Sequence, residues 1–224
     1  MERKVVRTAD GSTTIFIPDW DEHYHSKHGA LQEAYHVFIK NGLEEVLKSK
    51  NKELITIMEI GFGTGLNAFI TLMEAEKLGL QIDYTGIEAY PVSSEELKAL
   101  NYTDSFTGEN AQELFGLLHK VAWEKEQLIT DFFRLHKKQQ FFHEIDAENC
   151  FDLVYFDAFG ARVQPDLWTE EIFGIMFKAM KTGGVLVTYS AKGSVRRAMQ
   201  TVGFEVERLP GPPGKREMLR ARKP

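Results

Sequence analysis

The sequence predicts a doubly wound α/β fold, in which a mostly parallel sheet is covered by helices on both faces. From residue 55 onward, short apolar runs alternate with helical patterns, as in sheets built from strand–helix–strand units. Runs such as Leu153-Val154-Tyr155-Phe156 are apolar at every position, which is typical of a strand buried on both faces. A glycine-rich turn, Gly61-Phe62-Gly63-Thr64-Gly65, also joins the first apolar run to the first helical pattern.

Each element follows from its own pattern. Continuous or alternating apolar residues predict strands, and apolar residues at helical spacing predict helices. The predicted strands are residues 55–60, 82–87, 140–145, 152–156, 185–189, 204–208 and 216–221. The predicted helices are residues 66–77, 94–100, 111–134, 170–180 and 194–201. The last two strands form a hairpin, which is unusual in a dinucleotide-binding fold and suits a seven-stranded methyltransferase sheet.

The first 54 residues are less regular. The segment from Asp19 to Ser26 has no clean period, whereas Leu31, Tyr35, Phe38 and Ile39 share a helical stripe. We interpret residues 1–54 as an N-terminal cap on a single domain formed by residues 55–224, rather than as a second domain.

Composition excludes several classes of protein. The 224 residues are 43% hydrophobic and 27% charged, which supports a packed core and argues against disorder. No apolar run approaches the ~18 residues that cross a bilayer, and Met1-Glu2-Arg3-Lys4 leads into no signal segment. The single cysteine, Cys150, fits a reducing cytoplasm. No HExxH motif occurs, and His23, His25 and His28 lack the spacing of a metal site, so we expect no metal.

Charge is distributed unevenly along the chain. The net charge of −6 alone argues against nucleic acid. Residues 181–224, however, contain ten Lys and Arg against three Glu, a net charge of +7, which leaves −13 for residues 1–180. A basic C-terminal fifth on an acidic body indicates either a partner surface or a solvated edge.

The glycine turn indicates a nucleotide-like cofactor. Its pattern is Glu59-x-Gly61-x-Gly63-x-Gly65, the form found in S-adenosylmethionine-dependent methyltransferases, whereas a dinucleotide fingerprint would have glycine at position 66. Glu88 ends the second strand, where a carboxylate can accept hydrogen bonds from a ribose diol of either cofactor. Asp146-Ala147 follows the next predicted strand, so these two residues either hold an adenine amino group or form an exposed turn.

Asp157 is the candidate for chemistry. It ends the strand at residues 152–156 and should face the transferable methyl group. Methyl transfer needs a neutral nucleophile held close and aligned. An amine is mostly protonated at neutral pH, so a carboxylate could anchor it and receive its proton. The alternative is a structural cap for the following loop.

Several motifs resemble the methyltransferase domain of the bacterial tRNA 5-methylaminomethyl-2-thiouridine biosynthesis proteins. These are Phe156-Asp157-Ala158-Phe159 with Gln164-Pro165-Asp166-Leu167-Trp168-Thr169, residues 188–197, residues 203–206 with 214–219, and Tyr24-His25-Ser26 with residues 29–33 and 37–39. The resemblance implies a stand-alone class I, Rossmann-like methyltransferase that uses S-adenosylmethionine. Its implied substrate is 5-aminomethyl(-2-thio)uridine at the tRNA wobble position, and a separate oxidase is a candidate partner. The chain differs from the family's loop at two positions. The family often has proline where this chain has Ala161, and asparagine where it has Gln164.

The resemblance also suggests substrate contacts. An anticodon base could stack on Phe159, Tyr189 or Tyr24, with Glu33 and Gln164 nearby. Because the 210–215 loop leaves the carboxyl end of a parallel strand, basic residues should reach tRNA phosphates. These are Lys192, Arg196, Arg197, Lys215 and Arg216.

Two alternatives remain open at the level of sequence. One is a methyl- or aminopropyltransferase for small amines, which shares the fold and an acidic amine site. The other is a catalytically silent module that binds the cofactor and RNA.

Overall fold

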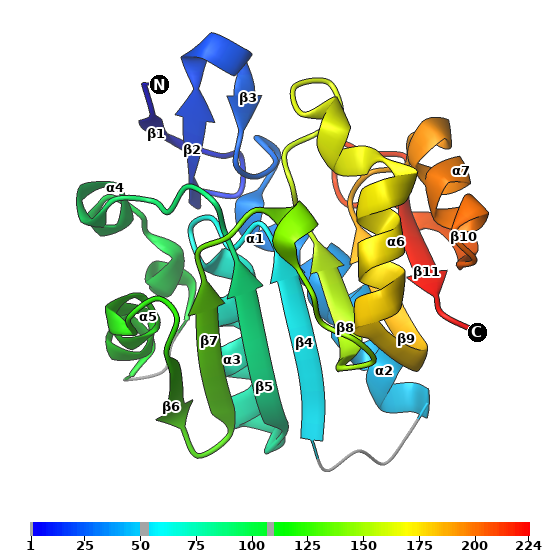
Figure 1. The fold of residues 1–224 in the computed structure, drawn as a ribbon. Coiled ribbons are helices and arrows are strands. Elements are labelled where there is room, and N and C mark those ends of the chain that lie inside the picture. Colours follow the sequence, from blue (N-terminus) through cyan, green and yellow to red (C-terminus); the bar gives the residue numbers. More distant parts are fainter. Residues whose placement is uncertain (1, 50–53, 107–109) are drawn as a thin grey trace.

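The centre of the molecule is an eight-stranded sheet. The computed structural model describes residues 2–49, 54–106 and 110–224. The strands are β4 (Leu54–Ile60), β5 (Gln81–Ile87), β6 (Glu126–Thr130), β7 (Phe133–Lys138), β8 (Phe151–Phe156), β9 (Met180–Thr188), β10 (Glu205–Pro210) and β11 (Glu217–Arg222). Their spatial order is β10-β11-β9-β8-β4-β5-β7-β6 (Figure 1). The five strands β7, β5, β4, β8 and β9 are parallel, and β11 runs antiparallel between β9 and β10. This arrangement confirms the predicted α/β class and its closing hairpin.

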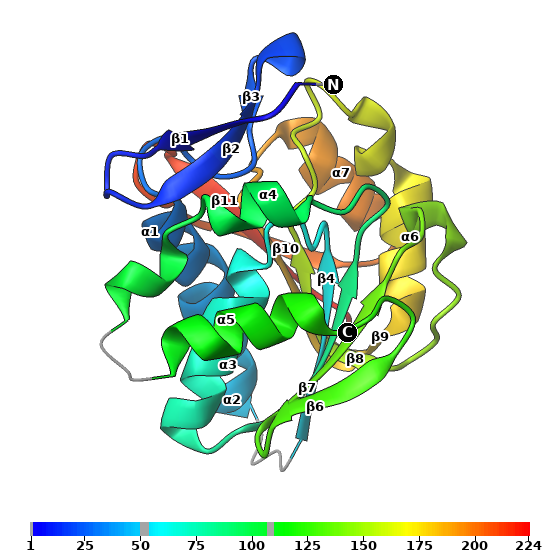
Figure 2. The same ribbon diagram turned by 90° about the vertical axis from the view of Figure 1, so that its left-hand side faces the viewer.

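Helices cover both faces of this sheet (Figures 1 and 2). One face carries α1 (Ala30–Ala34), the π-helical segment η2 (Tyr35–Leu43), α2 (Glu44–Ser49), α3 (Leu66–Leu78) and α5 (Ala111–Lys120). The other face carries α6 (Glu170–Ala179) and α7 (Gly193–Thr201). Strand β8 shows why a continuous apolar run is needed, since Leu153 and Tyr155 enter one core and Val154 and Phe156 the other.

A small antiparallel sheet lies over the carboxyl ends of the parallel strands (Figure 1). It consists of β1 (Lys4–Arg7), β2 (Thr13–Ile17) and β3 (Glu22–His23), in a segment for which the sequence predicted no strands. Arg162, in the loop after β8, donates hydrogen bonds of 2.9 Å to the carbonyls of Trp20 and Asp21. This contact ties the small sheet to the main one. The predicted boundary between residues 54 and 55 adjoins residues 50–53, which lie outside the described residues.

One predicted helix is wrong. Residues 111–134 form α5 only as far as Lys120, followed by β6 and the start of β7. The backbone leaves the helix at Val121, whose ψ is 127°, and turns again at Glu124, whose φ is +63°. Leu128, whose spacing from Leu114, Leu117 and Leu118 fits one face of a helix, is 54% exposed. The antiparallel strand β6 raises the sheet from the predicted seven strands to eight.

The strand predicted at residues 140–145 is also wrong. The third parallel strand is β7, which ends at Lys138, and residues 142–144 form a 3-10 turn, η4 (Phe142–Glu144). The period-two alternation of buried Phe133 and Leu135 with their exposed or half-buried neighbours marks the true strand. Asp146 therefore lies beyond a turn and not at a strand end.

The remaining short elements are α4 (Ser94–Lys98) and the 3-10 turns η1 (Pro18–Trp20), η3 (Tyr102–Ser105) and η5 (Pro165–Trp168). None of the helices in the described part of the chain has the length and apolar character needed to cross a membrane. Within the same residues, no cluster of three or more His, Cys, Asp or Glu side chains could hold a metal ion.

Candidate functional site

A cavity of about 940 Å³ opens at the carboxyl ends of β4, β5 and β8, beneath the small N-terminal sheet. Eleven residues of the predicted site line it: Glu59, Gly61, Gly63, Glu88, Asp157, Tyr24, Glu33, Phe159, Gln164, Tyr189 and Lys215. The other described residues of the predicted site are absent from its lining: Gly65, Asp146, Ala147, Lys192, Arg196, Arg197 and Arg216. From the segment after β7, the residues that line the cavity are Phe141 and Phe142.

The glycine turn directly follows β4 and is hydrogen-bonded to the end of β5. The backbone amides of Gly61 and Phe62 both donate to the carbonyl of Ile87, at 3.0 and 2.9 Å. Gly61 has φ +89°, and a Cβ atom there would lie 2.8 Å from the carbonyl oxygen of Asp157. Gly65, with φ +72°, precedes the first residue of α3. Glycine is therefore needed both for the turn and for the close approach of the two strand ends.

Glu88 accepts hydrogen bonds from two backbone amides, one on each carboxylate oxygen. Its Oε2 accepts a hydrogen bond of 3.0 Å from Gly63, and its Oε1 accepts one of 2.9 Å from Tyr90. Each carboxylate oxygen has more than one lone-pair direction, so the group can still accept hydrogen bonds from a diol. A glycine turn at one strand end and a carboxylate at the next are the features with which this class of fold can hold a nucleotide-like cofactor.

A chain of polar side chains forms the floor of the cavity. Nδ2 of Asn67 donates to Oε1 of Glu59 at 2.9 Å and to Oδ2 of Asp157 at 2.8 Å. The Tyr84 hydroxyl donates to Oε2 of Glu59 at 2.8 Å. Oδ1 of Asn67 is buried and has no hydrogen-bond partner among the described residues. This acceptor, with the carboxylates, fits a ligand that carries an amino group.

The same arrangement shifts both acids toward protonation. Burial raises the pKa of Asp157 to about 7, and the neighbouring Glu33 carboxylate contributes in the same direction. Burial and the charge of Asp157 hold the pKa of Glu59 well above its usual range. Asp157 can therefore gain or lose a proton near neutral pH.

Aromatic rings form the wall nearest the small sheet. Phe159 packs edge-on against Tyr24 and Trp20, with ring centroids 4.9 and 5.4 Å apart. The Trp168 indole donates a 2.8 Å hydrogen bond to the carbonyl of Phe159. The structure thus brings together Tyr24 and Phe159, two of the three aromatic residues expected to stack on a base, in one fixed wall.

Lys215, which the sequence predicts to contact a tRNA phosphate, is paired with an acidic side chain in this structure. Its Nζ forms an ion pair with Oε1 of Glu33 and lies 4.0 Å from the centroid of the Tyr189 ring. The backbone amide of Ser26 donates to the other oxygen of Glu33 at 2.7 Å. The 210–215 loop does lie beside the cavity, since Gly214 and Lys215 both line it.

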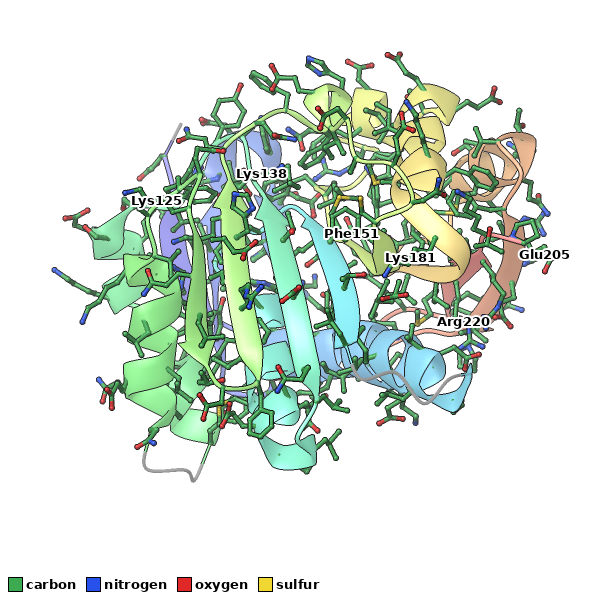
Figure 3. The ribbon with its side chains drawn as sticks, turned by 60° about the horizontal axis from the view of Figure 1, so that its bottom comes forward. Lys125, Lys138, Phe151, Lys181, Glu205 and Arg220 are labelled. Carbon is green, nitrogen blue, oxygen red and sulfur yellow. The ribbon has the colours of Figure 1, made fainter. Side chains whose placement is uncertain are left out.

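The other basic residues of the C-terminal fifth separate into two groups. Lys192, Arg196, Arg197 and Arg216 have no ion-pair partner in the described part of the chain. Arg220 pairs with Glu45 and Glu207, and Lys181 pairs with Asp152. Figure 3 shows Arg220 and Lys181 on the underside of the molecule, away from the small sheet.

Two polar residues of the cavity were missed by sequence reasoning. Asn67 carried one signal, a polar residue among the apolar residues of the first helical turn. His25 is bonded to Thr14, with its backbone amide 3.0 Å from the Thr14 hydroxyl, and its Nε2 lies 3.5 Å from the hydroxyl of Thr64. Burial lowers the pKa of His25 to about 3, so its imidazole is neutral. It links the small sheet to the glycine turn.

Comparisons with known proteins agree with this geometry. Residues 118–224 match a family described as S-adenosyl-L-methionine-dependent methyltransferase. The chain is 33% identical to the tRNA 5-methylaminomethyl-2-thiouridine biosynthesis bifunctional protein MnmC of Azoarcus sp. (strain BH72), over 93% of this chain and 34% of that protein. It is 30% identical to the MnmC protein of Cupriavidus metallidurans, over 93% of this chain and 32% of that protein. The chain thus spans about a third of the length of these relatives.

Solved structures with the same architecture include the crystal structure of MNMC2 from Aquifex aeolicus. It is 25% identical, with a TM-score of 0.83, over 100% of this chain and 70% of that chain. A probable spermidine synthase from Corynebacterium glutamicum has a TM-score of 0.57 at 17% identity, over 99% of this chain and 77% of that chain. The second likeness is one of fold alone.

Proposed function

The chain has the fold and the family match of an S-adenosyl-L-methionine-dependent methyltransferase, and from that premise we propose that it methylates the amine of 5-aminomethyl(-2-thio)uridine at the tRNA wobble position. The observation that carries the proposal is Asp157, a carboxylate in the cofactor cavity with a pKa of about 7. A proton acceptor of this strength suits an amine acceptor. The substrate named in the printed description of the MnmC relatives supports the choice of this amine.

The proposed cofactor residues belong to three strand ends. The Gly61–Gly65 turn would approach the cofactor with its backbone, Glu88 would accept from its ribose, and Phe141 and Phe142 would stand beside its base. The cofactor supplies an electrophilic methyl group when bound. The protein's own contribution is to align the acceptor nitrogen and to make it neutral.

Asp157 is the proposed base. Its ionised form would accept one proton from the acceptor ammonium, which leaves the nitrogen lone pair available. The hydrogen bond from Asn67 stabilises the ionised form, whereas burial and Glu33 oppose it. This balance keeps the carboxyl group able to take up and release a proton at neutral pH.

The proposed tRNA surface consists of basic residues in the C-terminal fifth of the chain. Lys192, Arg196, Arg197 and Arg216 are the proposed phosphate contacts, because they lack ion-pair partners among the described residues. Tyr24 and Phe159 would contact the target base. The proposed setting is the cytoplasm, where tRNA is modified.

The test uses purified protein and tRNA that carries 5-aminomethyl-2-thiouridine. We expect labelled methyl to move to the wobble nucleoside, and we expect Asp157→Ala to lower the single-turnover rate by at least about 100-fold. Binding of S-adenosylhomocysteine should change by less than about threefold. Asp166→Ala, an exposed carboxylate in the following loop, is the matched control. No transfer by the wild-type protein to this tRNA would refute the proposed acceptor, and full activity of Asp157→Ala would refute the role of Asp157.

A further inference from the structure

The ammonium group of Lys215 lies between a carboxylate and an aromatic face inside the cavity. Its Nζ is paired with Glu33 and lies 4.0 Å from the centroid of the Tyr189 ring. Glu33, Tyr189 and Lys215 line the same cavity as Asp157. A carboxylate opposite an aromatic face is a recognised way to bind an alkylammonium group.

The two walls of this site are fixed by contacts that do not involve Lys215. Glu33 is only 7% exposed, and its Oε2 accepts the 2.7 Å hydrogen bond from the backbone of Ser26. The Tyr189 hydroxyl donates to the carbonyl of Ala158 at 2.9 Å. The Tyr189 ring packs edge-on against Trp168, with centroids 6.1 Å apart. Without Lys215, the carboxylate and the ring would keep their places.

The Lys215 side chain is held less firmly than Glu33 and Tyr189. The Lys215 side chain is 33% exposed. The backbone of its loop is closed by a hydrogen bond from Lys215 to the carbonyl of Pro212 at 2.9 Å and one from Gly211 to Arg216 at 3.1 Å. The loop also begins at a fixed point, where Nε2 of His36 lies 2.8 Å from the carbonyl of Pro210. Rotation of the Lys215 side chain alone is enough to empty the site.

We propose that Glu33 and Tyr189 form the binding site for the primary ammonium group of the acceptor, and that Lys215 occupies this site in the free protein and leaves when the acceptor binds. The identity of the acceptor rests on the proposed function, whereas the ammonium site itself does not. Glu33 would bind the amine and Asp157, in the same cavity, would receive its proton. An acceptor without an amine does not compete with Lys215 for this site, so Lys215 should not affect its binding.

The test measures the binding of three probes in the absence of cofactor: 5-aminomethyluridine, 5-methyluridine and n-propylammonium. Removing a competing occupant raises the fraction of protein that can bind. Lys215→Met should therefore tighten binding of both amines by roughly tenfold and leave 5-methyluridine unchanged. Adding Glu33→Gln to that variant should abolish the gain. Lys215→Arg, which keeps a cation on the same loop, should bind like the wild type.

Arg208→Met is the matched control, because it removes one positive charge from an exposed ion pair on β10. It should leave all three affinities within twofold. The inference would be overturned if Lys215→Met also bound 5-methyluridine more tightly, or if it bound neither amine more tightly than the wild type. A gain for n-propylammonium but not for 5-aminomethyluridine would uphold the ammonium site and count against the proposed acceptor.

Discussion

The side-chain amide of Asn67 donates a 2.8 Å hydrogen bond to Oδ2 of Asp157. The same nitrogen lies 2.9 Å from Oε1 of Glu59, so the amide must present its donor side to both carboxylates. A donor stabilises the ionised form of an acid, and Asn67 accordingly opposes the effect of burial on the pKa of Asp157. The first turn of α3 thereby controls a group at the end of β8.

Replacing Asn67 by leucine should shift the pH dependence of methyl transfer. The variant loses the donor but keeps the number and branching of the side-chain heavy atoms, so the pKa of Asp157 should rise above about 7. We expect the pH at which the single-turnover rate is half-maximal to move upward by about one unit. The control is Thr71→Val, since the Thr71 hydroxyl donates to the backbone of Asn67 within α3 and touches neither carboxylate. A midpoint that stays in place would show that Asn67 only supports the helix.

Asp157 should also make stability depend on pH. Its pKa is raised from 3.8 to about 7 in the folded protein, so between these values the folded state holds a proton that the unfolded state has released. The unfolding free energy from this group therefore decreases as pH rises from 4 to 7 and is constant above 7. The unfolding free energy of Asp157→Asn, measured relative to that of the wild type, should therefore increase by on the order of 2 kcal/mol between pH 5 and pH 8.

Urea unfolding at the two pH values measures this difference. Asp166→Asn is the control, because Asp166 is exposed and its replacement should give the same change at both pH values. A decrease in the relative stability of Asp157→Asn with rising pH would have the wrong sign for a carboxyl group whose pKa is raised by burial.

The parallel core of the fold could be predicted because its signals are local. The apolar run of β8 and the glycine turn after β4 each identify an element without knowledge of its neighbours. The edge of the sheet could not be predicted in this way. Leucines at positions 114, 117, 118 and 128 fit a helix by spacing, but Leu128 is exposed on an edge strand, where no packing selects its pattern. Because the third parallel strand was predicted at residues 140–145 and not at β7, Asp146 was wrongly expected at the end of a strand.

In the candidate site, too, the features with a local sequence signal could be predicted, and those that depend on distant contacts could not. Glu88 and Asp157 could be predicted because each directly follows a strand in the chain. The role of Lys215 depends on α1 and the β10–β11 loop meeting in space, 182 residues apart in sequence. No local pattern indicates that Glu33 neutralises it. The charge asymmetry of the sequence therefore overstated the free basic surface, since Lys215, Arg220 and Arg222 are paired with acidic residues.

Gly61→Ala should affect both stability and activity. With φ at +89°, alanine is strained by about 1–2 kcal/mol, and its Cβ would also lie 2.8 Å from the Asp157 carbonyl. Gly183→Ala is a matched control, with φ +77° but no heavy atom within 4 Å of the added Cβ. We expect thermal unfolding to show the larger loss for Gly61→Ala, and only this variant to lose methyl transfer at temperatures where both are folded. Equal losses in stability and unchanged activity would mean that the strand ends can separate without consequence.

The free basic residues beside α7 should determine how salt affects tRNA binding. Each phosphate contact that is lost should reduce the slope of log K against log salt by about 0.7–0.9. Arg197→Ala and Lys192→Ala should therefore weaken binding most at low salt and flatten this slope, as filter binding at several salt concentrations would measure. Arg220→Ala is the control, because Arg220 pairs with Glu45 and Glu207 on the underside of the molecule (Figure 3). If Arg220→Ala changed the slope as much as Arg197→Ala, the tRNA would lie along the β10–β11 hairpin and not across the cavity.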